Sequence, residues 1–171
     1  MVVRAIVEDP SAVDWPMLTN AKLVAAGILK QAGVELTWSK GNRHLSCGER
    51  LIAITFLAPT PDSLLPGAMG YALPYSNGSS RITVFLDRLQ PLLARSPNSR
   101  GRILGHVMAH ELTHVLQGVA RHADRGLMKQ RWSENDIQQM AVKPLELTTA
   151  DVLLIRTAMS RCSTLVEELV P

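Results

Sequence analysis

The chain has 171 residues, of which 46% are hydrophobic and 19% are charged, and it carries a formal net charge of +3 at pH 7. This length and apolar content predict a single domain over residues 1–171 with a proper core. The lysines and arginines are scattered rather than clustered, and the longest apolar stretches are far too short to span a bilayer, so the composition argues against nucleic-acid-binding and membrane-spanning proteins.

The N-terminal part has the pattern of a strand, a long helix and a second strand. β-Branched residues over 2–8 predict the first strand. Ser11 is a good N-cap for a helix over 12–32, in which apolar residues keep helical spacing until a glycine ends the helix. Residues 35–39 alternate as a short strand. This order favours a right-handed crossover onto a parallel pair of strands.

Residues 41–48 are polar and predict a loop. His44 lies there, far in sequence from the other four histidines, which favours a surface residue rather than a remote metal ligand. Cys47 lies in the same segment, and with Cys162 it permits at most one disulfide; the sequence leaves open whether the two pair. Neither cysteine has the C-x-x-C spacing of a metal or redox site.

The middle of the chain predicts three more strands and a short helix. The strands are expected at residues 51–57, 69–74 and 81–86. The first is apolar enough to be central in the sheet, whereas the second is expected at the edge and is followed by a Ser-Asn-Gly turn. Asp87 is expected to cap the helix, which runs toward Ala94 and tolerates Pro91 only in its first turn.

The clearest signal is an apolar helix over residues 103–117. Apolar residues recur there at three- and four-residue spacing, which predicts a buried helix, and Gly118 is placed to end it. The helix contains an HExxH motif formed by His110, Glu111 and His114. Because residues four apart lie on one face of a helix, the two imidazoles can converge on one ion with the glutamate beside them.

A third ligand is expected after this helix ends. The chain can turn at Gly118 and bring His122 back toward the ion, with Asp124 and Glu134 as alternative ligands. Three protein ligands leave one position for water, whose pKa falls toward neutrality on zinc. His106 lies one turn before the motif. One straight helix cannot aim all of these histidines at one ion, so we expect His106 to pack beside the site; direct ligation is the alternative.

Two helices are expected in the C-terminal part. Ser133 can cap the first, over residues 134–140. Thr148 or Thr149 starts the second, which extends toward the C-terminus with an end that frays. Its inward side chains are expected to be Val152, Leu153 and Ile155. The predicted domain thus contains the sheet and N-terminal helix, the metal-binding segment and the C-terminal helices, over residues 1–100, 101–128 and 129–171.

HExxH followed by Gly118, His122 and Met128 resembles the metzincin clan of zinc endopeptidases, in which the third histidine follows a helix-ending glycine and a Met-turn lies under the metal. The usual clan motif is HExxHxxGxxH, whereas this chain has HExxHxxxGxxxH, one residue longer on each side of the glycine. Residues 126–128 look like a shortened Met-turn. Including the Met-Lys-x-x-Trp pattern of residues 128–132, the sequence is also similar to small bacterial zinc metallopeptidases.

The resemblance implies an α+β fold of the zincin or metzincin type, with a mixed twisted β-sheet packed on the N-terminal helix and the active-site helix. It implies a peptidase that uses one zinc ion bound by His110, His114 and His122. Glu111 would be the general base that takes a proton from water and delivers it to the leaving amine. Met128 would form an apolar floor under the ligands, or would be one more core methionine.

The resemblance also suggests how a peptide or protein substrate binds. In metzincin-like folds the edge strand above the active-site helix adds the substrate as another strand, and the candidate residues here are Gly70, Tyr71, Ala72 and Leu73. An ordinary sheet edge shielded by Pro74 is the alternative. The similar bacterial proteins are typically exported, which implies a secreted or periplasmic protein, although no signal peptide is visible here. We expect a monomer.

Two other function classes remain open. One is a zinc site kept for binding or structure without hydrolysis, which would have no use for Glu111. The other is an interaction module in which the histidine-bearing helix is ordinary core. In that case the four histidines of this stretch would need polar partners that their apolar neighbours cannot supply.

Overall fold

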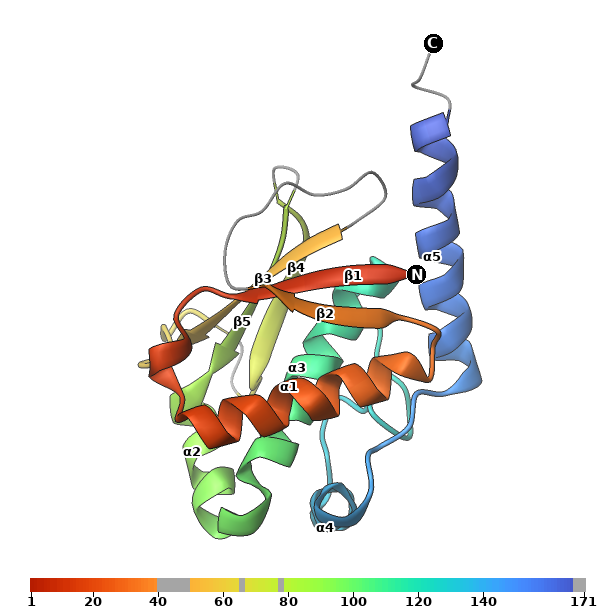
Figure 1. Ribbon diagram of the computed structural model, residues 1–171. Coiled ribbons are helices and arrows are strands. Elements are labelled where there is room, and N and C mark those ends of the chain that lie inside the picture. The colour runs from red at the N-terminus through yellow and green to blue at the C-terminus, as the bar shows by residue number, and fades with distance from the viewer. Residues whose placement is uncertain (40–49, 65–66, 77–78, 168–171) are drawn as a thin grey trace.

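The computed structural model describes residues 1–39, 50–64, 67–76 and 79–167, and it shows an α+β fold, which confirms the predicted class (Figure 1). A five-stranded mixed sheet has the order β2-β1-β3-β5-β4. Its strands are β1 (Val2–Val7), β2 (Glu35–Ser39), β3 (Arg50–Leu57), β4 (Gly70–Ser76) and β5 (Ser79–Phe85). The α-helices are α1 (Trp15–Lys30), α2 (Leu86–Arg95), α3 (Arg100–Gln117), α4 (Glu134–Val142) and α5 (Thr149–Glu167).

The sheet is parallel except at one edge. β1 pairs in parallel with β2 and β3, and β3 pairs in parallel with β5, whereas β4 runs antiparallel to β5. The expected parallel pair around the first long helix is therefore confirmed. The strand expected to be central is β3, which lies in the middle of the sheet, and the strand expected at the edge is β4.

The core lies between the sheet and two helices. Figure 1 shows α1 and α3 together on one face of the sheet, and α3 also contacts β4 and β5. The fully buried side chains that fill this layer include Leu18 and Ile28 of α1, Ile52 and Ile54 of β3, and Ile103, Leu104, Met108 and Leu112 of α3. This packing fixes the position of α3 relative to the edge of the sheet, where the predicted site lies.

Two glycines of α3 allow α1 to approach closely. A Cβ atom added at Gly105 would lie 2.7 Å from Val24 Cβ and 2.8 Å from the carbonyl oxygen of Ala21. One added at Gly101 would lie 2.7 Å from Asn20 Cβ. Real Cβ atoms do not approach other atoms this closely, so the spacing of the two helices depends on these glycines.

Replacing Gly105 by alanine is expected to lower the free energy of unfolding by about 1–3 kcal/mol, because the added methyl group overpacks the contact between α1 and α3. Gly27→Ala on α1 is a matched control. Apart from the neighbouring backbone of α1 itself, no atom lies within 4 Å of its added Cβ, so this variant is expected to gain about 0.5–1 kcal/mol from the better helix former. Urea unfolding measures both. Equal stability of Gly105→Ala and the parent would show that the helices separate without cost.

The start of α1 differs from the prediction. Asp14, not Ser11, caps the helix, because the Asp14 carboxylate accepts a hydrogen bond of 2.9 Å from the backbone N–H of Met17. Ser11 instead lies in a short 3-10 helix, Pro10–Ala12, where its N–H and hydroxyl both donate to Asp9. The competing Asp9 cap forms this separate turn, so the long helix begins later than expected.

The predictions for α2 and α5 also need correction. α2 begins before Asp87, whose carboxylate accepts hydrogen bonds from the N–H and hydroxyl of Thr60, and Pro91 lies inside the helix rather than in its first turn. On α5, Leu153 is 64% exposed, not inward. The inward row contains Asp151 and Ile155, which are fully buried. Asp151 binds the side chains of Arg121 and of the buried Gln117, and the apolar pattern does not reveal these partners.

Several expectations fall outside the described residues. These are the loop with His44 and Cys47, residues 77–78 of the Ser-Asn-Gly turn, and the end of the chain beyond 167. The Cys162 side chain is also outside them, so the pairing of the two cysteines stays open. Within the described residues, no helix combines the length and apolar character needed to cross a membrane.

Candidate metal centre

The HExxH motif lies in the most buried helix of the fold. Every residue from 103 to 117 on α3 is buried, and the helix ends at Gly118, which has the left-handed φ of +67°. The Gly118 N–H donates to the carbonyl of His114 at 3.0 Å. His110 and His114 lie one turn apart on the same face, and their Nε2 atoms are 3.1 Å apart. The predicted helix and its glycine end are confirmed.

The structure brings His122 to the same place. Its ring centroid lies 5.4 Å from that of His110 and 5.0 Å from that of His114. One nitrogen from each of the three rings lies within 4.8 Å of the others, and His122 is exposed while its two partners are buried. Among the described residues, Asp124 and Glu134 are not part of this group; Glu134 instead pairs with Arg95 at 3.2 Å.

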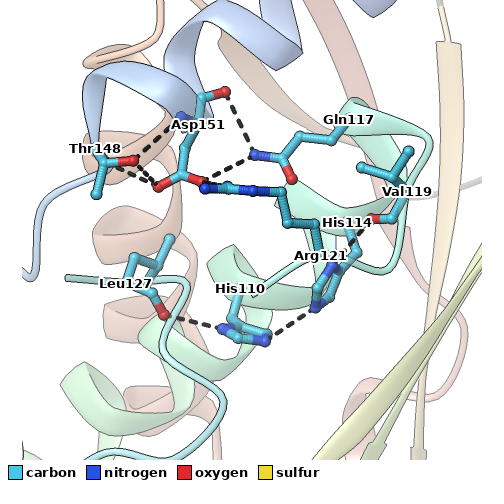
Figure 2. Close-up of polar contacts among 8 residues, drawn as sticks. All are labelled: His110, His114, Gln117, Val119, Arg121, Leu127, Thr148 and Asp151. Atoms are coloured by element: carbon cyan, nitrogen blue, oxygen red, sulfur yellow. Dashed lines mark hydrogen bonds and ion pairs between the residues drawn. The ribbon is translucent and has the colours of Figure 1, made fainter. Parts of the chain in front are cut away.

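Backbone carbonyls set the tautomers of the two helical histidines. His110 Nδ1 lies 2.9 Å from the Leu127 carbonyl, and His114 Nδ1 lies 3.3 Å from the Val119 carbonyl (Figure 2). A carbonyl only accepts, so each Nδ1 carries the proton and donates it. Burial lowers the pKa of His110 to about 4 and also lowers the pKa of His114, which keeps both rings neutral. Each Nε2 atom therefore presents a lone pair.

This arrangement fits a divalent cation. Two lone pairs that face each other across 3.1 Å repel unless a positive charge lies between them. Nitrogen ligands at about 2.0–2.1 Å from a tetrahedral zinc ion are about 3.3 Å apart, close to the spacing seen here. The Nδ1–H to carbonyl bonds are also the outer contacts that orient metal-binding histidines. The donor set of three imidazoles is therefore suited to zinc.

The Glu111 side chain extends from α3 to the start of the edge strand β4. It is buried, and this desolvation raises the pKa of its carboxyl group to about 8. A Cβ atom added at Gly70 would lie 3.1 Å from both Cγ and Oε1 of Glu111, and 2.8 Å from the carbonyl of Thr83. The absence of a side chain at Gly70 thus lets β4 pass directly over the carboxylate.

The segment after His122 supports the site from behind. Gly126 has a φ of +74°, and a side chain there would collide with the carbonyl of Glu146. The next carbonyl, that of Leu127, accepts from both His110 and the indole N–H of Trp132, the latter at 3.1 Å. Met128 follows directly and is fully buried. The residue predicted as an apolar floor thus adjoins the carbonyl that orients His110.

His106 packs beside the site rather than joining it. Its Nδ1 donates to the Arg102 carbonyl at 2.7 Å, and its Nε2 accepts from the Leu145 N–H at 3.0 Å. Both ring nitrogens are therefore used, and burial lowers the pKa of His106 to about 4, which keeps the ring neutral for this double role. The expected packing role is confirmed and the alternative of direct ligation is wrong.

The sequence predicted no role for two features near the site. One is Trp132, and the other is the group of Asp151, Arg121 and Gln117. Trp132 lies edge-on to His110 with ring centroids 5.6 Å apart. Asp151 is fully buried and binds Arg121 and Gln117 (Figure 2). The only readable signal was the Thr148-x-x-Asp151 spacing of a capping box, which gives no hint of a partner 30 residues earlier.

Comparison with known proteins gives a likeness among solved structures. No family model and no curated protein matches the chain. Among solved structures, the chain is similar to the crystal structure of metalloproteinase-II from Bacteroides fragilis, with a TM-score of 0.52 and 16% sequence identity. The match covers 92% of this chain and 52% of that chain, so this chain spans about half the length of its structural neighbour. The likeness is one of fold, and it says nothing by itself of activity, substrate or mechanism.

Proposed function

We propose that this chain is a zinc-dependent peptidase in which His110, His114 and His122 hold one zinc ion and Glu111 is the general base. The observation that carries the proposal is the convergence of three ring nitrogens, two of them lone-pair donors 3.1 Å apart, beside a buried carboxylate on the same helix. The fold shared with a metalloproteinase supports it.

Each part of the site has a role in this reaction. Zinc supplies a Lewis acid that makes water acidic near neutral pH and polarises a carbonyl group. The Glu111 carboxylate takes the proton of the attacking water and later delivers it to the leaving amine. Burial raises the pKa of Glu111, and the positive charge of a bound zinc ion would favour the ionised form that a general base needs. Met128 forms the apolar floor behind the ligands.

The substrate is a peptide or protein segment that adds to the outer edge of β4, the last strand in the order of the sheet. In the β4–β5 ladder, the Phe85 N–H donates to the Met69 carbonyl, and Gly70 is the Cα partner of Val84. Alternation along the strand then directs the backbone groups of Gly70 and Ala72 away from β5 and those of Tyr71 and Leu73 toward it. An extended peptide paired with Gly70 and Ala72 would lie next to Glu111.

The test is a metal and cleavage assay on the purified protein. We expect about one zinc ion per chain, cleavage of an unfolded protein or a peptide library, loss of cleavage with a chelator, and recovery with added zinc. Ala72→Pro, which removes an outward N–H, should raise KM with little effect on zinc content. Cleavage that ignores the chelator, or a chain that binds no zinc, would overturn the proposal.

We also propose that the peptidase acts as a monomer. We propose further that it is secreted or periplasmic, which the resemblance to exported bacterial metallopeptidases implies. Sedimentation of the purified protein and fractionation of the source cells would check these two points. Dimers at working concentration, or protein confined to the cytoplasm, would contradict them.

A further inference from the structure

The bend that carries His122 is held on both sides of that residue. On one side, the Ala123 N–H donates to the Met128 carbonyl at 2.7 Å, and Ala123 forms an isolated bridge with Lys129. On the other side, Arg121 Nη1 donates to Asp151 Oδ1 at 2.8 Å. His122 thus lies between a backbone anchor and a side-chain anchor, after the helix itself has ended.

Asp151 joins three segments at one carboxylate (Figure 2). Its Oδ2 accepts from the N–H and the hydroxyl of Thr148, at 2.9 and 2.6 Å, which caps α5. Its Oδ1 accepts from Arg121 and, at 3.4 Å, from the side-chain amide of Gln117, the last residue of α3. The start of α5, the end of α3 and the bend before His122 therefore meet at a fully buried charge.

The third histidine needs such an anchor more than the other two. His110 and His114 are oriented by the helix and by carbonyls that accept from their Nδ1 atoms. His122 lies beyond the left-handed turn at Gly118, outside the helix whose backbone hydrogen bonds fix the positions of His110 and His114. A buried carboxylate is costly without a counter-charge, so Asp151 holds Arg121, and the adjoining His122, in a defined place.

We propose that Arg121 and Asp151 are positioning residues that hold His122 in its ligand position. This inference rests on the metal site of the proposed function, but it does not depend on hydrolysis. In this chain the glycine lies one residue further along, and the third histidine two residues further along, than in the usual motif. The Arg121–Asp151 pair fixes the longer bend at the residue before the ligand.

The test measures zinc affinity by competition with a chromophoric chelator. Arg121→Met is expected to weaken zinc binding by about 10- to 100-fold, the usual effect of removing a group that orients a metal ligand. Arg95→Met is the matched control, because Arg95 also pairs with a carboxylate, that of Glu134, but at the exposed surface away from the three histidines. Its affinity is expected to equal that of the parent.

A double-mutant cycle separates positioning from general damage. In a His122→Ala background, Arg121→Met should cause no further loss of zinc affinity, because the ligand that it positions is already gone. The absorption spectrum of the cobalt-loaded protein should likewise change in Arg121→Met toward that of His122→Ala. An equal affinity loss in both backgrounds, or an unchanged affinity in Arg121→Met, would overturn the inference.

Stability is controlled with a second variant. Arg121→Met leaves the Asp151 carboxylate buried without its partner, which destabilises the fold, whereas the double variant Arg121→Met/Asp151→Asn removes that charge. We expect the double variant to recover thermal stability but not zinc affinity. Recovery of both would show a purely structural role and overturn the inference. If the parent itself bound no zinc, the proposed function would fail, and the inference with it; a parent that binds zinc but cleaves nothing leaves this test intact.

Discussion

Glu111→Gln is expected to lower kcat for peptide hydrolysis by about 10²- to 10⁴-fold while about one zinc ion stays bound per chain. Glutamine has nearly the same shape and keeps the packing against Gly70, but its amide cannot take a proton from water. The three histidines that form the candidate ligand group are unchanged. Steady-state kinetics with a quenched fluorescent peptide, paired with elemental analysis, measure both quantities.

Glu146→Gln is the control for this variant. The Glu146 side chain is 73% exposed, and its backbone carbonyl, not its carboxylate, contacts the turn at Gly126. The kcat of Glu146→Gln should match that of the parent. A Glu111→Gln protein that hydrolyses peptides as fast as the parent would rule out Glu111 as the base. A parent that binds zinc but cleaves no member of a diverse peptide library would favour the non-catalytic zinc protein instead.

Removing zinc is expected to lower the free energy of unfolding by about 4 kcal/mol, relative to protein held at a free zinc concentration about a thousandfold above Kd. In the proposed function the ion binds the folded site and has no preformed site in the unfolded chain, so its binding energy would add to stability. For a domain of this size the loss corresponds to a fall in Tm of about 8–16 °C. Thermal unfolding followed by circular dichroism, with and without a chelator, measures the shift.

His110→Ala identifies the site responsible for that shift. The variant lacks one of the two nitrogens that lie 3.1 Å apart, so added zinc should change its Tm far less than it changes that of the parent. His106→Gln is a useful comparison: it loses stability, because the bonds to Arg102 and Leu145 change, but keeps its response to zinc. A parent whose Tm ignores zinc would favour the interaction module, in which the histidines of α3 are ordinary core.

Local spacing in the sequence was sufficient for the parts of this protein that a single helix or strand determines. The 3.6-residue period placed His110 and His114 on one face of α3, and a glycine after the apolar run marked its end. Alternation and apolar runs likewise located the five strands, the central place of β3 and the edge place of β4. These features depend on geometry within a single helix or strand, which the order of the residues encodes directly.

Tertiary structure alone decided the contacts between distant segments. His106 packs rather than binds a metal because its Nε2 accepts a hydrogen bond from the backbone N–H of Leu145. The inward face of α5 includes Asp151 because its carboxylate pairs with the Arg121 side chain. Neither pairing has a periodic signature, because each joins residues 30 or more positions apart whose meeting depends on how helices, turns and sheet pack together. The approach of His122 to the two helical histidines is of the same kind: the sequence allowed it, and the folded bend brought it about.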